Sequence, residues 1–153
     1  MRNPNFKYPD TKAFNFVVNR LEEKGITLND LAQLVYDMQK DFEKINLKEC
    51  KTTVEDVLHK RELLNNAMVG LTMDQLTETG QVPEPLKSII TNDAGVFGVD
   101  ETLALQIANI YGTIGTTNIQ KIDTEENHVN TFLDDLIAAI VAAACGKIAH
   151  QYA

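Results

Sequence analysis

The sequence is poor in several features that mark other classes of protein. It has no tryptophan, and it has 14 lysine and arginine residues against 22 aspartate and glutamate residues, which gives a net charge of -8. Lysine and arginine residues do not cluster into a stripe along the chain that would offset this negative charge. A nucleic-acid-binding protein needs a basic surface for the phosphate backbone, so this class is excluded. The negative charge also disfavours passive adsorption to an anionic membrane.

Cysteines and long hydrophobic runs are scarce as well. Cys50 and Cys145 are far apart, and no Cys/His spacing typical of a zinc site is present, so we expect two reduced thiols in an intracellular protein. Residues 1–8 lack the apolar stretch of a signal peptide. The longest apolar run is shorter than the ~20 residues that cross a bilayer. We therefore expect a cytoplasmic protein without a transmembrane segment, with peripheral contact at the inner face of the membrane as the alternative.

What the chain does have is helical patterning over most of its length. Its 153 residues, 44% of them hydrophobic, suffice for one domain with its own core. No useful length alternates apolar and polar residues as a strand does, so we expect an all-α helical bundle. We predict a flexible tail over residues 1–11 and a single domain over residues 12–153. The expected helices cover residues 12–24, 28–42, 52–68, 72–80, a short segment after Pro83, residues 99–110 and residues 132–149.

Local signals place some of these helix starts. Thr27-Leu-Asn-Asp30 and Thr52-Thr-Val-Glu55 resemble capping boxes, in which a side-chain oxygen accepts from a free backbone amide of the first turn. Thr72 is predicted to start a shorter helix.

The last expected helix organises the chain. From Leu136 to Gly146 it carries only apolar or small residues on every face, and a helix that is apolar all round is buried all round. We predict that the other helices surround it. Asp134 and Asp135 stand at its start, and buried carboxylates are costly unless they hold a cation or accept hydrogen bonds.

A second acidic pair precedes another apolar helix. Asp100 and Glu101 stand at its start, and Asp93 lies one loop before them. Magnesium is suited to such positions, because it takes one or two carboxylates, keeps several waters and accepts phosphate oxygens. Acidic residues are also common in first helical turns because they complement the helix dipole, so either pair alone is more typical of a structural role. Two such pairs, each beside an apolar helix, favour a structural and a functional role equally.

Further polar residues are candidates for substrate contact. Lys60 and Arg61 could bind phosphate, Arg61 best because of its forked donors, although such a cluster is also typical of a solvated helix face. Glu62 is a possible further metal ligand. His128 is either a general acid or a residue of the cap region, and Asn118 follows a Gly/Thr-rich break.

Several of these segments occur together in one order. They are Lys60-Arg61-Glu62, Asn92-Asp93-Ala-Gly-Val-Phe-Gly-Val-Asp100-Glu101, Tyr111-Gly-Thr-Ile-Gly-Thr-Thr-Asn118 and His128-x3-Phe-Leu-Asp134-Asp135. As a set they resemble the soluble Firmicute branch of the phosphatidylglycerophosphatase A family, also labelled low-temperature-requirement C protein. The likeness runs from about residue 12 to residue 150.

The wider family carries two acidic motifs that this chain matches. Asp93, Asp100 and Glu101 match D-P-x-x-x-x-x-D-E, with Ala94 in place of proline, and Leu133, Asp134, Asp135 and Ala138 match L-D-D-x-x-A. The resemblance implies an α-helical bundle and a magnesium-dependent phosphomonoesterase that removes the terminal phosphate of phosphatidylglycerophosphate. The membrane-embedded relatives have hydrophobic spans and an N-terminal Gly/Pro-rich motif, which this chain lacks. It therefore reaches the membrane by a specific face or acts on a soluble phosphate ester.

We expect the catalytic residues Asp93, Asp100 and Asp134, a Mg²⁺ site formed by Asp100, Glu101, Asp134, Asp135 and Glu62, and substrate contacts from Lys60, Arg61, Asn118 and His128. The substrate is a phospholipid headgroup or another phosphate ester, and we expect a homodimer. Two alternatives remain: an all-α nucleotide pyrophosphohydrolase, and a non-catalytic helical module whose carboxylates only cap helices.

Overall fold

The computed structural model describes residues 1–112 and 130–152, and these ranges contain helices and no strand. This confirms the predicted all-α class. The helices are α1 (Asp10–Glu23), α2 (Leu28–Gln39), α3 (Leu47–Leu58), α4 (Arg61–Glu78), α5 (Leu86–Thr91), α6 (Val99–Ala108), the short 3-10 helix η1 (Asn109–Tyr111) and α8 (Thr131–Gln151).

One predicted capping box forms as expected and another does not. The Asp30 amide donates to the Thr27 hydroxyl at 3.1 Å, and the Thr27 amide donates to the Asp30 carboxylate at 2.8 Å, so this box starts α2. Thr52 does not start a helix. Instead α3 begins after Asn46, whose side chain accepts from the Glu49 amide at 2.8 Å.

The predicted helix of residues 52–68 is wrong in a second respect. The chain breaks at His59 and Lys60, so that α3 ends there and α4 starts at Arg61. The expected start at Thr72 also lies inside α4, which continues to Glu78. Threonine hydroxyls can bond to carbonyls one turn earlier within a helix, as Thr77 does to Met73 at 2.7 Å, so a threonine alone does not mark a helix start.

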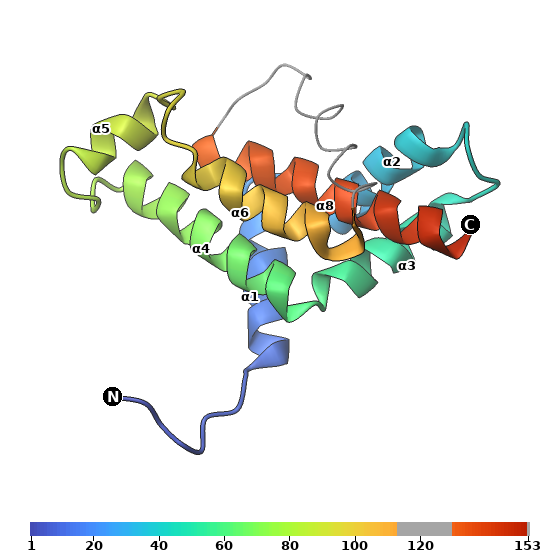
Figure 1. Cartoon of the computed structure of the whole chain (residues 1–153), viewed down its shortest axis with the longest axis horizontal. Coiled ribbons are helices and arrows are strands. Elements are labelled where there is room, and N and C mark those ends of the chain that lie inside the picture. Colours follow the sequence, from blue (N-terminus) through green and yellow to red (C-terminus); the bar gives the residue numbers. More distant parts are fainter. Residues whose placement is uncertain (113–129, 153) are drawn as a thin grey trace.

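Helix α8 packs against α2, α3, α4 and α6, while α1 packs against α4 (Figure 1). Every residue from Ala138 to Gly146 is buried. The close approach of α4 to α8 depends on Gly70, because a Cβ atom there would lie only 2.8 Å from a methyl carbon of Leu136. Small residues at such crossings let two helix backbones come together. No helix in the described part of the chain is both long and apolar enough to span a membrane.

The relative direction of three helices positions the candidate site. Figure 1 shows that α6 and α8 begin at the same end of the molecule, where α4 ends. The C-terminal part of α4 therefore faces the first turns of α6 and α8. Both predicted acidic pairs belong to these first turns.

Candidate functional site

A buried carboxylate of α4 caps the start of α8. Asp74 is only 4% exposed, and it accepts hydrogen bonds from the amides of Phe132 at 3.1 Å and Leu133 at 2.7 Å. These are the second and third residues of α8, whose free amides are usually satisfied by the residue that precedes the helix. Here that residue, Asn130, makes no such cap, and α4 supplies it from another part of the chain.

Burial sets the protonation behaviour of this carboxylate. It raises the pKa of Asp74 from 3.8 to about 6, although the two amide bonds act in the opposite direction. Glu78, one helical turn further along α4, contributes to the increase because a second negative charge disfavours ionisation. The side chain of Asp74 therefore changes charge in the range just below neutral pH.

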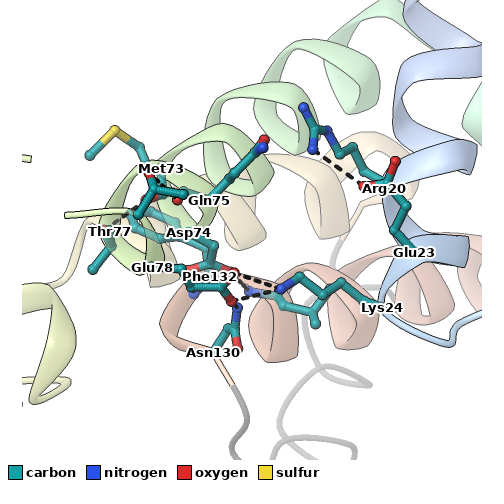
Figure 2. A network of polar contacts seen from close by, with 12 residues as sticks. Arg20, Glu23, Lys24, Met73, Asp74, Gln75, Thr77, Glu78, Asn130 and Phe132 are labelled. Atoms are coloured by element: carbon teal, nitrogen blue, oxygen red, sulfur yellow. Dashed lines mark hydrogen bonds and ion pairs between the residues drawn. The ribbon is translucent and has the colours of Figure 1, made fainter. Parts of the chain in front are cut away.

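A polar network extends from Asp74 towards α1 (Figure 2). Lys24 donates to both oxygens of Glu78, at 2.6 and 2.9 Å, and the Asn130 side-chain amide donates to the same carboxylate. The hydrogen bonds from Lys24 and then Asn130 hold the pKa of Glu78 below its usual value. Thr131 adds a bond from its hydroxyl to the carbonyl of Ile90, at 2.7 Å. The start of α8 is thus attached to α4 and to the end of α5.

Asp74 and Glu78 line two neighbouring clefts. The first, of about 220 Å³, lies between α1, α4 and α8, with Arg20 and Lys24 in its wall. The second, of about 320 Å³, lies between α4, α5 and the start of α8, and includes Lys87. Each cleft therefore combines carboxylates with basic side chains at the beginning of α8.

A larger groove of about 550 Å³ lies elsewhere, between α3 and the C-terminal end of α8. Its walls include Lys48, Glu49, Asp56 and Tyr152, and none of the predicted site residues. The two smaller clefts are not lined by the acidic pairs either, but residues of the first turn of α8 form part of their walls, directly before Asp134 in the chain. We therefore assign the candidate site to the smaller clefts.

The predicted acidic residues lie at this end of the bundle, with different exposure. Asp100 is buried in the first turn of α6, at 5% exposure, whereas Glu101 is exposed. Asp134 and Asp135 are half-buried in the first turns of α8. Asp93 is exposed in the loop before α6, where its backbone has a positive φ of 46°.

The predicted basic residues lie at the other end of α4. Glu62 and Asp74 are twelve residues apart on one helix, which is about 18 Å at 1.5 Å per residue. Arg61 donates two 2.8 Å hydrogen bonds to the carboxylate of Asp10. The structure therefore does not bring Lys60, Arg61 and Glu62 together with the acidic pairs. Asn118 and His128 lie outside the described residues.

The donor chemistry of the acidic end suits magnesium. Its candidates are carboxylate oxygens, which are the ligands that Mg²⁺ prefers, and one or two of them suffice when waters and phosphate complete the shell. Within residues 1–112 and 130–152 no three His, Cys, Asp or Glu side chains form a group that could hold a metal ion. The five carboxylates predicted as ligands, all of which belong to the described residues, therefore do not come together as one such group.

Sequence reasoning missed Asp74 and its network, although one signal was present. Ala67, Gly70 and Leu71 are buried residues of α4, and Asp74 follows them at the three- and four-residue spacing of a single helix face. A carboxylate on a buried face needs donors, and here the donors are amides of another helix.

Comparison with known proteins places the chain among close relatives. The family model described as Phosphatidylglycerophosphatase A matches residues 17–150. The uncharacterized protein YpjQ of Bacillus subtilis (strain 168) is 35% identical over 95% of this chain and 89% of its own length. A solved structure of a protein of unknown function from Bacillus stearothermophilus is 39% identical, with a TM-score of 0.87 over 97% of this chain and 98% of that chain. The low temperature requirement C protein from Listeria monocytogenes is also 39% identical, with a TM-score of 0.83 over 92% of this chain and 96% of that chain.

Proposed function

The chain belongs to the phosphatidylglycerophosphatase A family, and from this premise we propose that it is a magnesium-dependent phosphomonoesterase acting on phosphatidylglycerophosphate. The observation that carries the proposal is the shared location of the two acidic motifs. They lie in the first turns of α6 and α8, which begin at the same end of the bundle (Figure 1). Segments more than 30 residues apart in sequence thus contribute carboxylates to one region.

A second observation weakens the alternative in which these carboxylates only cap helices. Asp74 of α4 accepts hydrogen bonds from the amides of Phe132 and Leu133. These two free amides of α8 therefore do not need Asp134 or Asp135 as a cap. In α6, Asp100 is buried, and a buried carboxylate is costly without a cation or donors. Both facts favour a functional role for the acidic pairs.

In this proposal Asp100 and Asp134 would hold Mg²⁺, and Glu101 and Asp135 would accept hydrogen bonds from its waters. When bound, the ion would polarise the phosphoryl oxygens and lower the pKa of an attacking water. The remaining roles belong to side chains of the protein. Asp93, exposed in the adjoining loop, would accept a proton from the attacking water.

The reaction itself is a hydrolysis. Water attacks the phosphorus, the bond between phosphorus and the glycerol oxygen breaks, and the products are inorganic phosphate and phosphatidylglycerol. Arg20, Lys24 and Lys87 line the two clefts at the start of α8, and we assign phosphate binding to them. Lys60 and Arg61 are omitted from this role because they lie at the other end of α4.

The test is phosphate release from short-chain phosphatidylglycerophosphate in detergent, with magnesium and with a chelator. Asp100→Asn and Asp134→Asn should abolish the magnesium-dependent release while both variants stay folded. Asp41→Asn, a change at an exposed position of the segment after α2, is the matched control and should leave the release unchanged.

Three outcomes would count against the proposal. Full activity of both variants would refute the assignment of the carboxylates. Release of pyrophosphate from nucleotides, without activity on the lipid, would favour the nucleotide pyrophosphohydrolase. A melting temperature that does not respond to magnesium, together with no release, would favour the non-catalytic module, since a specific ligand stabilises the folded state.

A further inference from the structure

The basic residues at the start of α4 have no role in the proposed site, and the N-terminal segment that contacts Arg61 through Tyr8 carries further cations. Residues 1–9 form an arm without helix that leads into α1 and extends away from the bundle (Figure 1). Arg61 donates two hydrogen bonds to Asp10, the first residue of α1, and its guanidinium lies 4.9 Å from the centre of the ring of Tyr8, which belongs to the arm. The Tyr8 hydroxyl donates to the Asn65 side chain at 2.7 Å. The arm is therefore attached to the start of α4.

This attachment creates a basic surface on a protein whose net charge is -8. The same two segments also carry two carboxylates, Asp10, which is paired with Arg61, and Glu62. Met1 is fully exposed on the arm, and Phe6 is 67% exposed. We name this set the basic arm surface; its exposed cations and apolar side chains are Arg2, Lys7, Lys12, Lys60, Arg61, Met1 and Phe6.

We propose that the basic arm surface docks the protein onto an anionic phospholipid bilayer. Lysine and arginine side chains near such a surface are attracted by its negative potential, and exposed apolar side chains enter the boundary between headgroups and acyl chains. A nucleic acid would engage the same cations but would leave Met1 and Phe6 in water, so the bilayer is the favoured partner. The inference rests on the proposed function, because the substrate of that reaction is an anionic lipid.

The basic arm surface and the candidate site lie at opposite ends of α4. Arg61 and Asp74 are thirteen residues apart, which is about 20 Å along the helix. The surface therefore acts as a tether that concentrates the protein at the bilayer, and it does not contact the phosphate that is removed. Losing the tether should lower activity on vesicles and leave activity on a dispersed short-chain substrate unchanged.

The experiment is co-sedimentation of the full chain with vesicles of equal parts phosphatidylglycerol and phosphatidylcholine, and with vesicles of phosphatidylcholine alone. Binding is expected only to the anionic vesicles, and it should weaken as salt is added. The double variant Arg2→Gln/Lys7→Gln should reduce the partition coefficient on the order of tenfold or more, and Phe6→Ser should also reduce it. Lys44→Gln/Lys48→Gln changes the net charge equally at exposed positions outside the surface and should bind as the unaltered protein does.

The outcomes separate this inference from the proposed function. Equal binding by the arm variant and its control would overturn the docking surface, as would no vesicle binding by a protein that hydrolyses the short-chain substrate. Arm-dependent binding without any hydrolysis would support the docking surface and refute the proposed function. Arm-dependent binding to duplex or single-stranded nucleic acid, with none to vesicles, would overturn the choice of partner. The substituted side chains are exposed, so unchanged melting temperatures are expected.

Discussion

Replacement of Asp74 by asparagine should change how the stability of the protein depends on pH. The carboxylate is buried, and its pKa is raised from 3.8 in the unfolded chain to about 6. Between these two values the folded protein binds a proton that the unfolded chain has already lost. The contribution of Asp74 to the free energy of unfolding therefore falls as pH rises from about 4 to about 7, because ionisation of this group is less favourable in the folded state.

The size of the effect follows from the shift. Each pKa unit corresponds to 1.36 kcal/mol, so a shift of roughly two units contributes about 3 kcal/mol of stability well below pH 3.8, of which about 2 kcal/mol is still present at pH 4 and almost none at pH 7. Asparagine cannot titrate. The stability of the unaltered protein minus that of Asp74→Asn should thus decrease by about 2 kcal/mol between pH 4 and pH 7. Asp10 and Glu78, whose pKa values are lowered, contribute in the opposite direction in both proteins and largely cancel in the difference.

The assay is urea unfolding followed by far-ultraviolet circular dichroism, at several pH values and with a chelator present. Asp41→Asn is the control for removing one exposed carboxylate, and its difference from the unaltered protein should be nearly independent of pH. Repeating the comparison in a Glu78→Gln background removes the coupling between the two carboxylates. A difference that stays flat, or that increases with pH, would refute the conclusion that burial outweighs the two amide hydrogen bonds.

Three further tests concern helix packing, helix starts and the burial of a cysteine. Gly70→Ala should lower the free energy of unfolding by ~1–3 kcal/mol, because its Cβ would lie 2.8 Å from Leu136; an unchanged melting temperature would mean that the leucine moves aside without strain. Thr27→Ala should cost about 1 kcal/mol by removing the cap of α2, whereas Thr52→Ala, inside α3, should cost much less. Equal losses in urea unfolding would contradict the observed helix starts. Burial raises the pKa of Cys145 to about 12, so a thiol reagent at pH 8 should label it only after unfolding.

Local signals in the chain were enough for several elements. The spacing of apolar residues predicts the all-α class. Residues typical of helix starts predict that α2 begins at Leu28 and that α6 begins at Val99. The extent of α8 was predicted to within two residues at its C-terminal end, because residues 136–146 are apolar or small on every helical face. These features depend on residues that are neighbours along the chain.

The division of residues 47–78 into α3 and α4 was not predicted correctly. The start of α3 has a local signal, because Asn46 stands three residues before Glu49 and accepts from its amide, but the match at Thr52 was preferred to it. The break at His59 and Lys60 has no comparable local signal. Where α3 ends, the ring of His59 stacks on that of Phe14 in α1, with the ring centres 4.1 Å apart. A helix boundary fixed by contacts with another helix leaves little trace in the sequence around it.

The sequence by itself determined the all-α class and the positions of the acidic motifs at helix starts, because both depend on short-range patterns. Only the tertiary structure decided which end of α4 meets those motifs. The capping of α8 by Asp74 and the attachment of the arm by Arg61 join residues 58 and 51 positions apart. Contacts at such separation arise from burial of the helix faces, which sets the order and direction of packing and therefore which polar groups meet.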